Sequence, residues 1–271
     1  MSEQEVHTET VDRGPAVALA GLLDIDVPAG DLPPLWHVVY LLERPRQSEL
    51  GPDGHPVTGI PAPPGPGRKR MFAGGRVETH ELLRYDEPAT RTTCVSATRE
   101  KVGRSGPLTF ITVRSEYTQA GRLKIVDESD IVYRAPGSSI DARVGTLDDQ
   151  PHRAEREPSL RLSADVALLF RFSALTYNGH RIHYDQRWTA REGYGDLVVH
   201  GPLQALMMAE LVRRTGSGVA GRCFSYRLIA PMVGPQAFTV LAAHGGVDTG
   251  AEVTDVFGTV TARSAVAPLS R

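Results

Sequence analysis

Four strand-like segments joined by short connections restrict this chain to a fold built around an antiparallel sheet. The pattern is best in residues 108–117, where Leu108 and Phe110 alternate with Thr109 and Ile111, as in a strand covered on both faces. Parallel strands need long crossover connections, so segments this close in sequence are expected to pair antiparallel. The four segments are 76–83, 91–101, 108–117 and 123–134.

The second half of the chain repeats this plan, with a helix that precedes its strands. Pro202 is typical of a first helical position, Leu206 and Leu211 lie on one apolar face, and Gly216 stops the helix. Three further strand-like segments then follow, at 223–228, 237–243 and 256–262.

The first half also offers helical segments ahead of its strands. Residues 17–23 suit a short helix, and we interpret the apolar run 35–42 as a helix because two prolines precede it. An α+β architecture is therefore expected, with two copies of one unit in which a sheet wraps a central helix. We place the two units at residues 1–150 and 151–271.

Composition favours a protein that acts on small molecules. The 271 residues carry a formal net charge of −2 with both signs interspersed, which gives no field to recruit nucleic acid or a membrane surface. No secretion signal and no apolar run of the ~20 residues that span a bilayer is found, so a cytoplasmic location is expected. Cys94 and Cys223 lie far apart in strand-like segments and indicate neither a disulfide nor a metal cluster.

Two segments are predicted to be irregular. Residues 1–13 are polar and acidic and are interpreted as a disordered tail. Residues 51–67 are dense in Gly and Pro, and such long loops are usually lids, binding loops or disordered.

Candidate chemistry concentrates in residues 170–202. This stretch holds His180, His183 and His200, and a glycine at 201 just before the predicted helix. His180 and His183 could share a helix face and, with Asp185, suggest a metal site. No further Cys or acidic residue is spaced to complete such a site, so we expect no metal.

Several motifs together resemble the MaoC-like acyl-thioester hydratases and dehydratases, which have a double hotdog fold. Within that family the resemblance is strongest to the mesaconyl-C4-CoA hydratase group and the mitochondrial-type 3-hydroxyacyl dehydratases. The motifs are Phe-Ala-Gly-Gly-Arg at 72–76, Lys-Val-Gly-Arg-Ser-Gly-Pro-Leu at 101–108, Asp-Ile-Val-Tyr-Arg at 130–134, Phe-Ser-Ala-Leu-Thr-Tyr-Asn-Gly-His-Arg-Ile-His-Tyr-Asp at 172–185 and His-Gly-Pro-Leu at 200–203.

The resemblance implies a catalytic second half and a degenerate first half that clamps the substrate. The family pattern has an Asp and, five residues later, a His that hold the water to be added. His183 matches the His, but Asn178 stands where the Asp is expected. An amide can orient water but cannot take its proton, so either His183 acts as acid and base alone or a carboxylate from elsewhere replaces the missing one.

The remaining expected roles follow from hydration chemistry. The Gly201 N–H, at the start of a helix, can bind the thioester oxygen as it becomes negative. Substrate contacts are expected from Tyr177, His180, Asp185 and His200. Asp185 could instead orient His183 or act as the missing carboxylate, and His200 could simply cap or pack the helix start. Arg76, Arg104 and Arg171 are candidates to bind a substrate carboxylate or CoA phosphates, with surface ion pairing as the alternative.

These residues predict a hydro-lyase that hydrates an enoyl thioester or dehydrates a 3-hydroxyacyl thioester. CoA or phosphopantetheine would enter as part of the substrate, and no separate cofactor is expected. By resemblance, the substrate pair is mesaconyl-C4-CoA and citramalyl-CoA or a similar branched dicarboxyl-CoA. The alternatives are a 3-hydroxyacyl-carrier-protein dehydratase and a non-catalytic thioester-binding subunit. The two halves are expected to pair as one pseudo-dimer, with a homodimer as a further option.

Overall fold

The computed structural model describes residues 3–65, 68–103, 106–134, 142–150 and 156–269. The strands are β1 (Gln4–Thr10), β2 (Lys69–Thr79), β3 (Pro88–Gly103), β4 (Gly106–Gln119), β5 (Arg122–Arg134), β6 (Ser159–Ala164), β7 (Arg222–Leu228), β8 (Gln236–Ala242), β9 (Ala251–Thr254) and β10 (Val260–Pro268). The α-helices are α1 (Gly14–Leu22), α2 (Val166–Leu175), α3 (Gln186–Glu192) and α4 (Gly201–Thr215), and short 3-10 turns lie at Trp36–Val39, Gln47–Glu49, Arg181–His183 and Val247–Thr249.

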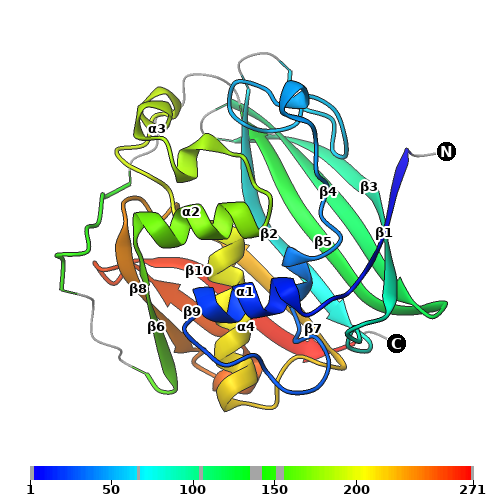
Figure 1. The fold of residues 1–271 in the computed structure, drawn as a ribbon. Coiled ribbons are helices and arrows are strands. Elements are labelled where there is room, and N and C mark those ends of the chain that lie inside the picture. Colours follow the sequence, from blue (N-terminus) through cyan, green and yellow to red (C-terminus); the bar gives the residue numbers. More distant parts are fainter. Residues whose placement is uncertain (1–2, 66–67, 104–105, 135–141, 151–155, 270–271) are drawn as a thin grey trace.

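All ten strands form one antiparallel sheet in the order β1-β3-β4-β5-β2-β7-β10-β9-β8-β6. The first five strands in this order precede residue 135 and the other five follow residue 158. The two halves meet where β2 pairs with β7, so each half contributes one continuous block of the sheet. Figure 1 shows helices α1, α2 and α4 gathered on one face of this curved sheet.

Two glycines allow β2 to lie against β7. Gly74 has a φ of 150°, and a Cβ there would overlap the carbonyl oxygen of Tyr226 on β7. A Cβ on Gly75 would lie 2.5 Å from the carbonyl oxygen of Glu128. The Gly-Gly pair of the 72–76 motif is therefore explained by crowding from β7 at Gly74 and from both β5 and the Tyr226 side chain at Gly75.

Helix α4 is the centre of the second half. It packs against β8, β9 and β10, and residues 203–212 are all buried. Its buried carboxylate, Glu210, accepts hydrogen bonds from Arg213, Arg214 and the Trp36 indole N–H at 2.7–2.9 Å. These charge-assisted bonds satisfy a group whose isolated burial would be costly.

The observed elements confirm the α+β prediction and the antiparallel sheet, and correct several local expectations. Residues 1–13 are not a disordered tail, because Gln4–Thr10 pairs with β3 over its whole length. The expected helix at 35–42 is only the 3-10 turn Trp36–Val39, since Leu35 and Leu41 have positive φ angles. Strands β6 and β9 were not predicted, and β10 begins at Val260 rather than at 256.

Two other expectations stay as predictions. The first is the division into units 1–150 and 151–271. Much of the segment between the halves, 135–141 and 151–155, lies outside the described residues. The other is the cytoplasmic location. Within the described residues, each helix is too short or too polar to cross a bilayer.

Gly74→Ala should lower the free energy of unfolding by about 2–4 kcal/mol, because the new Cβ adds backbone strain and overlaps β7. Gly21→Ala in α1 is the matched control, since no atom lies within 4 Å of its Cβ position. The control should be neutral or slightly stabilising. Urea unfolding followed by circular dichroism measures both, and equal stability of the two variants would contradict the role given to Gly74.

Candidate active site

A cavity of about 550 Å³ lies where the two halves of the sheet meet. Its walls come from β2, β4 and β5 in the first half and from the segments 178–183, 194–204 and 228–232 in the second. The residues that line the cavity include Arg70, Arg134, His55, Asn178, His180, His183 and Gly201. The pairing of β2 with β7 thus brings residues from both halves to one site.

The end of helix α2 places Asn178 at this cavity. The helix stops at Leu175, Tyr177 has a φ of 51°, and the Asn178 N–H donates to the Ser173 carbonyl at 2.8 Å. The Asn178 side-chain oxygen then accepts from the His180 N–H at 3.0 Å. This turn is the helix break expected near Asn178, and it lets both Asn178 and His183 line one cavity.

His183 is buried in its neutral form. Its Nδ1 donates to the Val198 carbonyl oxygen at 2.7 Å. Because that oxygen can only accept, the proton sits on Nδ1, and Nε2 keeps its lone pair. Burial and the nearby His180 lower the pKa of His183 to about 3. His183 is therefore suited to accept a hydrogen bond and poorly suited to hold an extra proton.

Gly201 lines the same cavity at the start of α4. A Cβ at this position would overlap the Leu228 side chain and lie 3.3 Å from Phe72. Among the described residues, no hydrogen bond uses the Gly201 N–H as donor. A free N–H at a helix N-terminus is a donor for an oxygen that gains negative charge.

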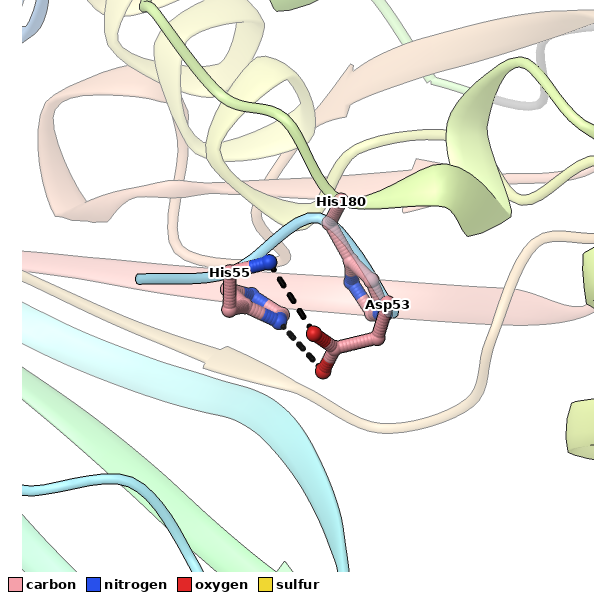
Figure 2. Close-up of side chains that lie close together, drawn as sticks. All are labelled: Asp53, His55 and His180. Atoms are coloured by element: carbon pink, nitrogen blue, oxygen red, sulfur yellow. Dashed lines mark hydrogen bonds and ion pairs between the residues drawn. The ribbon is translucent and has the colours of Figure 1, made fainter. Parts of the chain in front are cut away.

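A second acidic and histidine-containing group reaches the site from the loop before β2. Asp53 and His55 lie on residues 51–57, and Figure 2 shows them next to His180. The Asp53 carboxylate accepts from the His55 N–H and from His55 Nδ1, both at 3.0 Å. Burial alone would raise the pKa of Asp53, but the hydrogen bonds and charge of His55 lower it to about 2. Asp53 is therefore a carboxylate at neutral pH.

The loop is locked onto the segment that carries Asn178. Gly54 has a φ of 89°, and a Cβ there would overlap the Gly179 carbonyl. The Arg181 N–H donates to the Asp53 carbonyl at 2.9 Å. Close backbone contact and this hydrogen bond hold residues 53–54 against the segment 179–181, and a binding role for the loop stays a prediction.

Four imidazole rings follow one another across the site. The ring centroids of His55 and His180 are 4.1 Å apart, those of His180 and His183 are 5.6 Å apart, and those of His183 and His200 are 3.6 Å apart. A carboxylate is paired with each of the first two rings, since Glu192 lies 3.3 Å from His180 Nε2. Burial lowers the pKa of His55 and of His200, which favours the neutral forms of these two rings.

A second cavity of about 540 Å³ adjoins the first. His55 and Asn178 line both cavities, so they form the boundary between them. Tyr177 and the ion-paired residues Glu43 and Arg91 line only the second. A thioester is long enough to occupy one cavity with its acyl group and the other with its carrier arm.

Among the described residues, the group formed by Asp53, His55 and His180 could hold a metal ion. Ligand atoms of Asp53, His55 and His180 lie within 4.8 Å of one another, and nitrogen and carboxylate ligands suit zinc. Sequence spacing offered no further ligand to complete a metal site, but the fold brings Asp53 and His55 to His180 from a distant loop. The expectation of no metal stays a prediction.

Of the four residues expected to contact the substrate, two line a cavity and two do not. His180 lines the first cavity and Tyr177 the second. His200 is fully buried behind His183, with Nε2 2.8 Å from the Ser173 hydroxyl. Asp185 caps α3 and pairs with Arg181. His200 and Asp185 lie outside both sets of lining residues and have structural contacts instead.

The arginines at the cavity differ from those expected. Arg76 pairs with Glu128 and Glu78, Arg171 is exposed on α2, and neither lines a cavity. Arg104 lies outside the described residues. Arg70 and Arg134 line the first cavity instead, and burial lowers the pKa of Arg70. No carboxylate of the described residues forms an ion pair with Arg70.

Sequence reasoning missed Asp53, His55 and Glu192, and it considered Arg70 only as part of the basic triplet 68–70, which could bind phosphates or be a solvated surface cluster. The only available signals were the position of Asp53 and His55 in a predicted binding loop and the basic triplet 68–70 beside it. Neither pattern indicates which way a side chain points. A basic triplet in a sequence is more often a solvated surface cluster than a binding site.

Comparisons with known proteins identify the family of this chain. Residues 35–234 match the sequence model of the family described as hydroxyacyl-thioester dehydratase type 2. The chain is 43% identical over 239 residues to a mesaconyl-C(4)-CoA hydratase of Chloroflexus aurantiacus, covering 85% of this chain and 84% of that protein.

Solved structures support the fold. A MaoC-like dehydratase of Phytophthora capsici has a TM-score of 0.69 at 15% identity, covering 99% of this chain and 96% of the other. A Mycobacterium tuberculosis protein described as a double hotdog has a TM-score of 0.53 at 16% identity, covering 98% and 96%. The prediction of a double hotdog is confirmed.

The predicted activity class, hydratase or dehydratase chemistry on an enoyl or 3-hydroxyacyl thioester, is likewise confirmed. The match covers well over half of the chain, from the turn at Trp36 through residues 170–202 to the strand that follows α4. This chain belongs to the hydroxyacyl-thioester dehydratase type 2 family.

Proposed function

We propose that the protein reversibly hydrates mesaconyl-C4-CoA to citramalyl-CoA, or a similar branched dicarboxyl-CoA. The position of Arg70 in the cavity is the observation that supports this choice of substrate. Its guanidinium lines the cavity that also holds His183 and Gly201, and no carboxylate of the described residues pairs with it. A cation in such a place is complementary to a substrate carboxylate.

The chemistry of the substrate fits this arrangement. In mesaconyl-C4-CoA the free carboxylate is attached to the carbon that water attacks, so a carboxylate-binding group must lie close to the water site. Arg70 and His183 line one cavity of about 550 Å³. A simple acyl chain has no charge at this position and would form no ion pair with Arg70.

His183, Asn178 and Gly201 supply the rest of the site in this proposal. The Nε2 lone pair of His183 accepts a hydrogen bond from the attacking water, and the Asn178 amide N–H groups can donate to the water or the substrate. The Gly201 N–H donates to the thioester oxygen as the enolate forms. CoA is part of the substrate, and the second cavity is wide enough for its pantetheine arm.

A carrier-protein dehydratase remains the second candidate because the family is described by hydroxyacyl-thioester dehydration. The apolar wall formed by Phe72, Ile131 and Met232 favours this alternative. A panel of enoyl- and 3-hydroxyacyl-CoAs with and without a second carboxylate separates the two candidates when gain or loss of water is followed by mass spectrometry.

Arg70→Met should lower kcat/KM for mesaconyl-C4-CoA by about 100-fold, since losing a charge-assisted contact costs about 2–5 kcal/mol. The rate with crotonyl-CoA, which has no carboxylate, should change little. Arg76→Met on the same strand is the control, because its partners are Glu128 and Glu78. Equal losses on both substrates would contradict the assignment of Arg70.

His183→Ala should lower kcat by about 100-fold, because the water loses its hydrogen-bond acceptor. His244→Ala, an exposed position, is the matched control. Undiminished hydration by His183→Ala would rule out its catalytic role. A wild-type protein that binds CoA esters and never turns them over would instead favour the non-catalytic thioester-binding alternative.

A further inference from the structure

We propose that His55, oriented by Asp53, is the acid–base residue of this site and supplies the proton transfer that Asn178 cannot perform. This inference rests on the proposed hydration function. It assigns the role of the missing carboxylate to a pair that comes from the other half of the chain. His55 and Asn178 line the same two cavities, so the replacement lies beside the residue it replaces.

The geometry fixes which nitrogen of His55 can react. Asp53 accepts from both the backbone N–H and Nδ1 of His55 at 3.0 Å (Figure 2). A carboxylate only accepts, so Nδ1 carries the proton and Nε2 keeps its lone pair. An adjacent carboxylate also stabilises the imidazolium that forms when Nε2 takes a proton. The pair therefore combines a general base with the group that orients it.

The loop holds this pair rigidly. The backbone contact between Gly54 and Gly179 allows no side chain on either residue. The Arg181 guanidinium adds a hydrogen bond to the Pro52 carbonyl at 2.9 Å. Catalytic groups must be held in position before the substrate arrives, and these contacts achieve that although His55 lies on a loop.

His55 fits the role better than the two other histidines of the cavity. His180 Nε2 faces Glu192, and His180 lines only the first cavity. His183 uses Nδ1 for the Val198 carbonyl and has no carboxylate partner to stabilise a positive charge. Of the three, His55 is the one that borders both cavities and has a carboxylate on its far nitrogen.

The proposed step balances without another reactant. The water oxygen bonds to the β-carbon while His55 Nε2 takes one water proton. The electron pair of the carbon–carbon double bond moves to the α-carbon and the thioester oxygen, where the Gly201 N–H donates a hydrogen bond. The His55 imidazolium then gives a proton to the α-carbon, so that one water is added and His55 is neutral again.

The test compares His55→Ala, Asp53→Asn and the exposed control His244→Ala as full-length proteins. Hydration of mesaconyl-C4-CoA and of crotonyl-CoA is measured, with binding of unreactive butyryl-CoA measured by calorimetry. His55→Ala should lose about 1,000-fold in kcat on both enoyl esters, within the range for a general base, with butyryl-CoA affinity unchanged. The control should keep the wild-type rate.

Asp53→Asn distinguishes an acid–base pair from a structural contact. The groups that act on His55 are Asp53, His180 and Arg70, and Asp53 is the one that raises its pKa. His55 must be neutral to take a proton, so activity falls as the pH drops below its pKa. Removing the Asp53 charge should lower kcat and move this acid limb of kcat/KM to lower pH. Because this variant keeps the hydrogen-bond acceptor, it tests the proposal even if His55→Ala does not fold.

Each outcome bears on one of the two proposals. Wild-type activity in folded His55→Ala, or an unmoved acid limb in Asp53→Asn, would overturn the role of the pair. Loss of wild-type activity on EDTA dialysis with recovery on adding zinc would also overturn it, because Asp53, His55 and His180 would then be metal ligands. Hydration of crotonyl-CoA alone would refute the dicarboxyl substrate and leave the pair under test, whereas inactivity on both esters would refute both proposals.

Discussion

The backbone pairing of β2 with β7 is the contact on which the architecture depends. It fuses two five-stranded blocks into one sheet and depends on Gly74 and Gly75, where a side chain would meet the neighbouring backbone. The cavity lies at this junction, with walls from β2 and β5 on one side and from the start of α4 on the other. The binding site therefore exists only when both halves are joined.

Burial sets the electrostatics of the site. Four imidazole rings stand in a row, and burial lowers the pKa of three of them, His55, His183 and His200. Neutral imidazoles can accept protons, but a positive charge on them is costly unless a carboxylate lies nearby. Asp53 and Glu192 provide such carboxylates at one end of the row only, which gives the rings different roles.

In our proposal the site has the groups that a hydratase needs, but one of them comes from a different part of the chain than the family motif implies. The fold supplies a helix N-terminus at Gly201 and a turn after α2, as the motifs of the family imply. The carboxylate expected at position 178 is an amide, and the nearby acid–base group in our proposal comes from the first half. In that proposal the first half does more than clamp the substrate, since it contributes Arg70, Asp53 and His55.

The sequence by itself determined the antiparallel sheet, helix α4, the break near Asn178 and, through its motifs, the family. These depend on local alternation, capping residues and turn residues that neighbours in the chain decide. It did not determine that residues 4–10 join the sheet, which way Arg70 faces, or that Asp53 and His55 reach Asn178, 125 and 123 residues further along the chain. Such contacts are set by the packing of Gly54 on Gly179 and of β2 on β7, and no local pattern encodes which distant backbone a glycine meets.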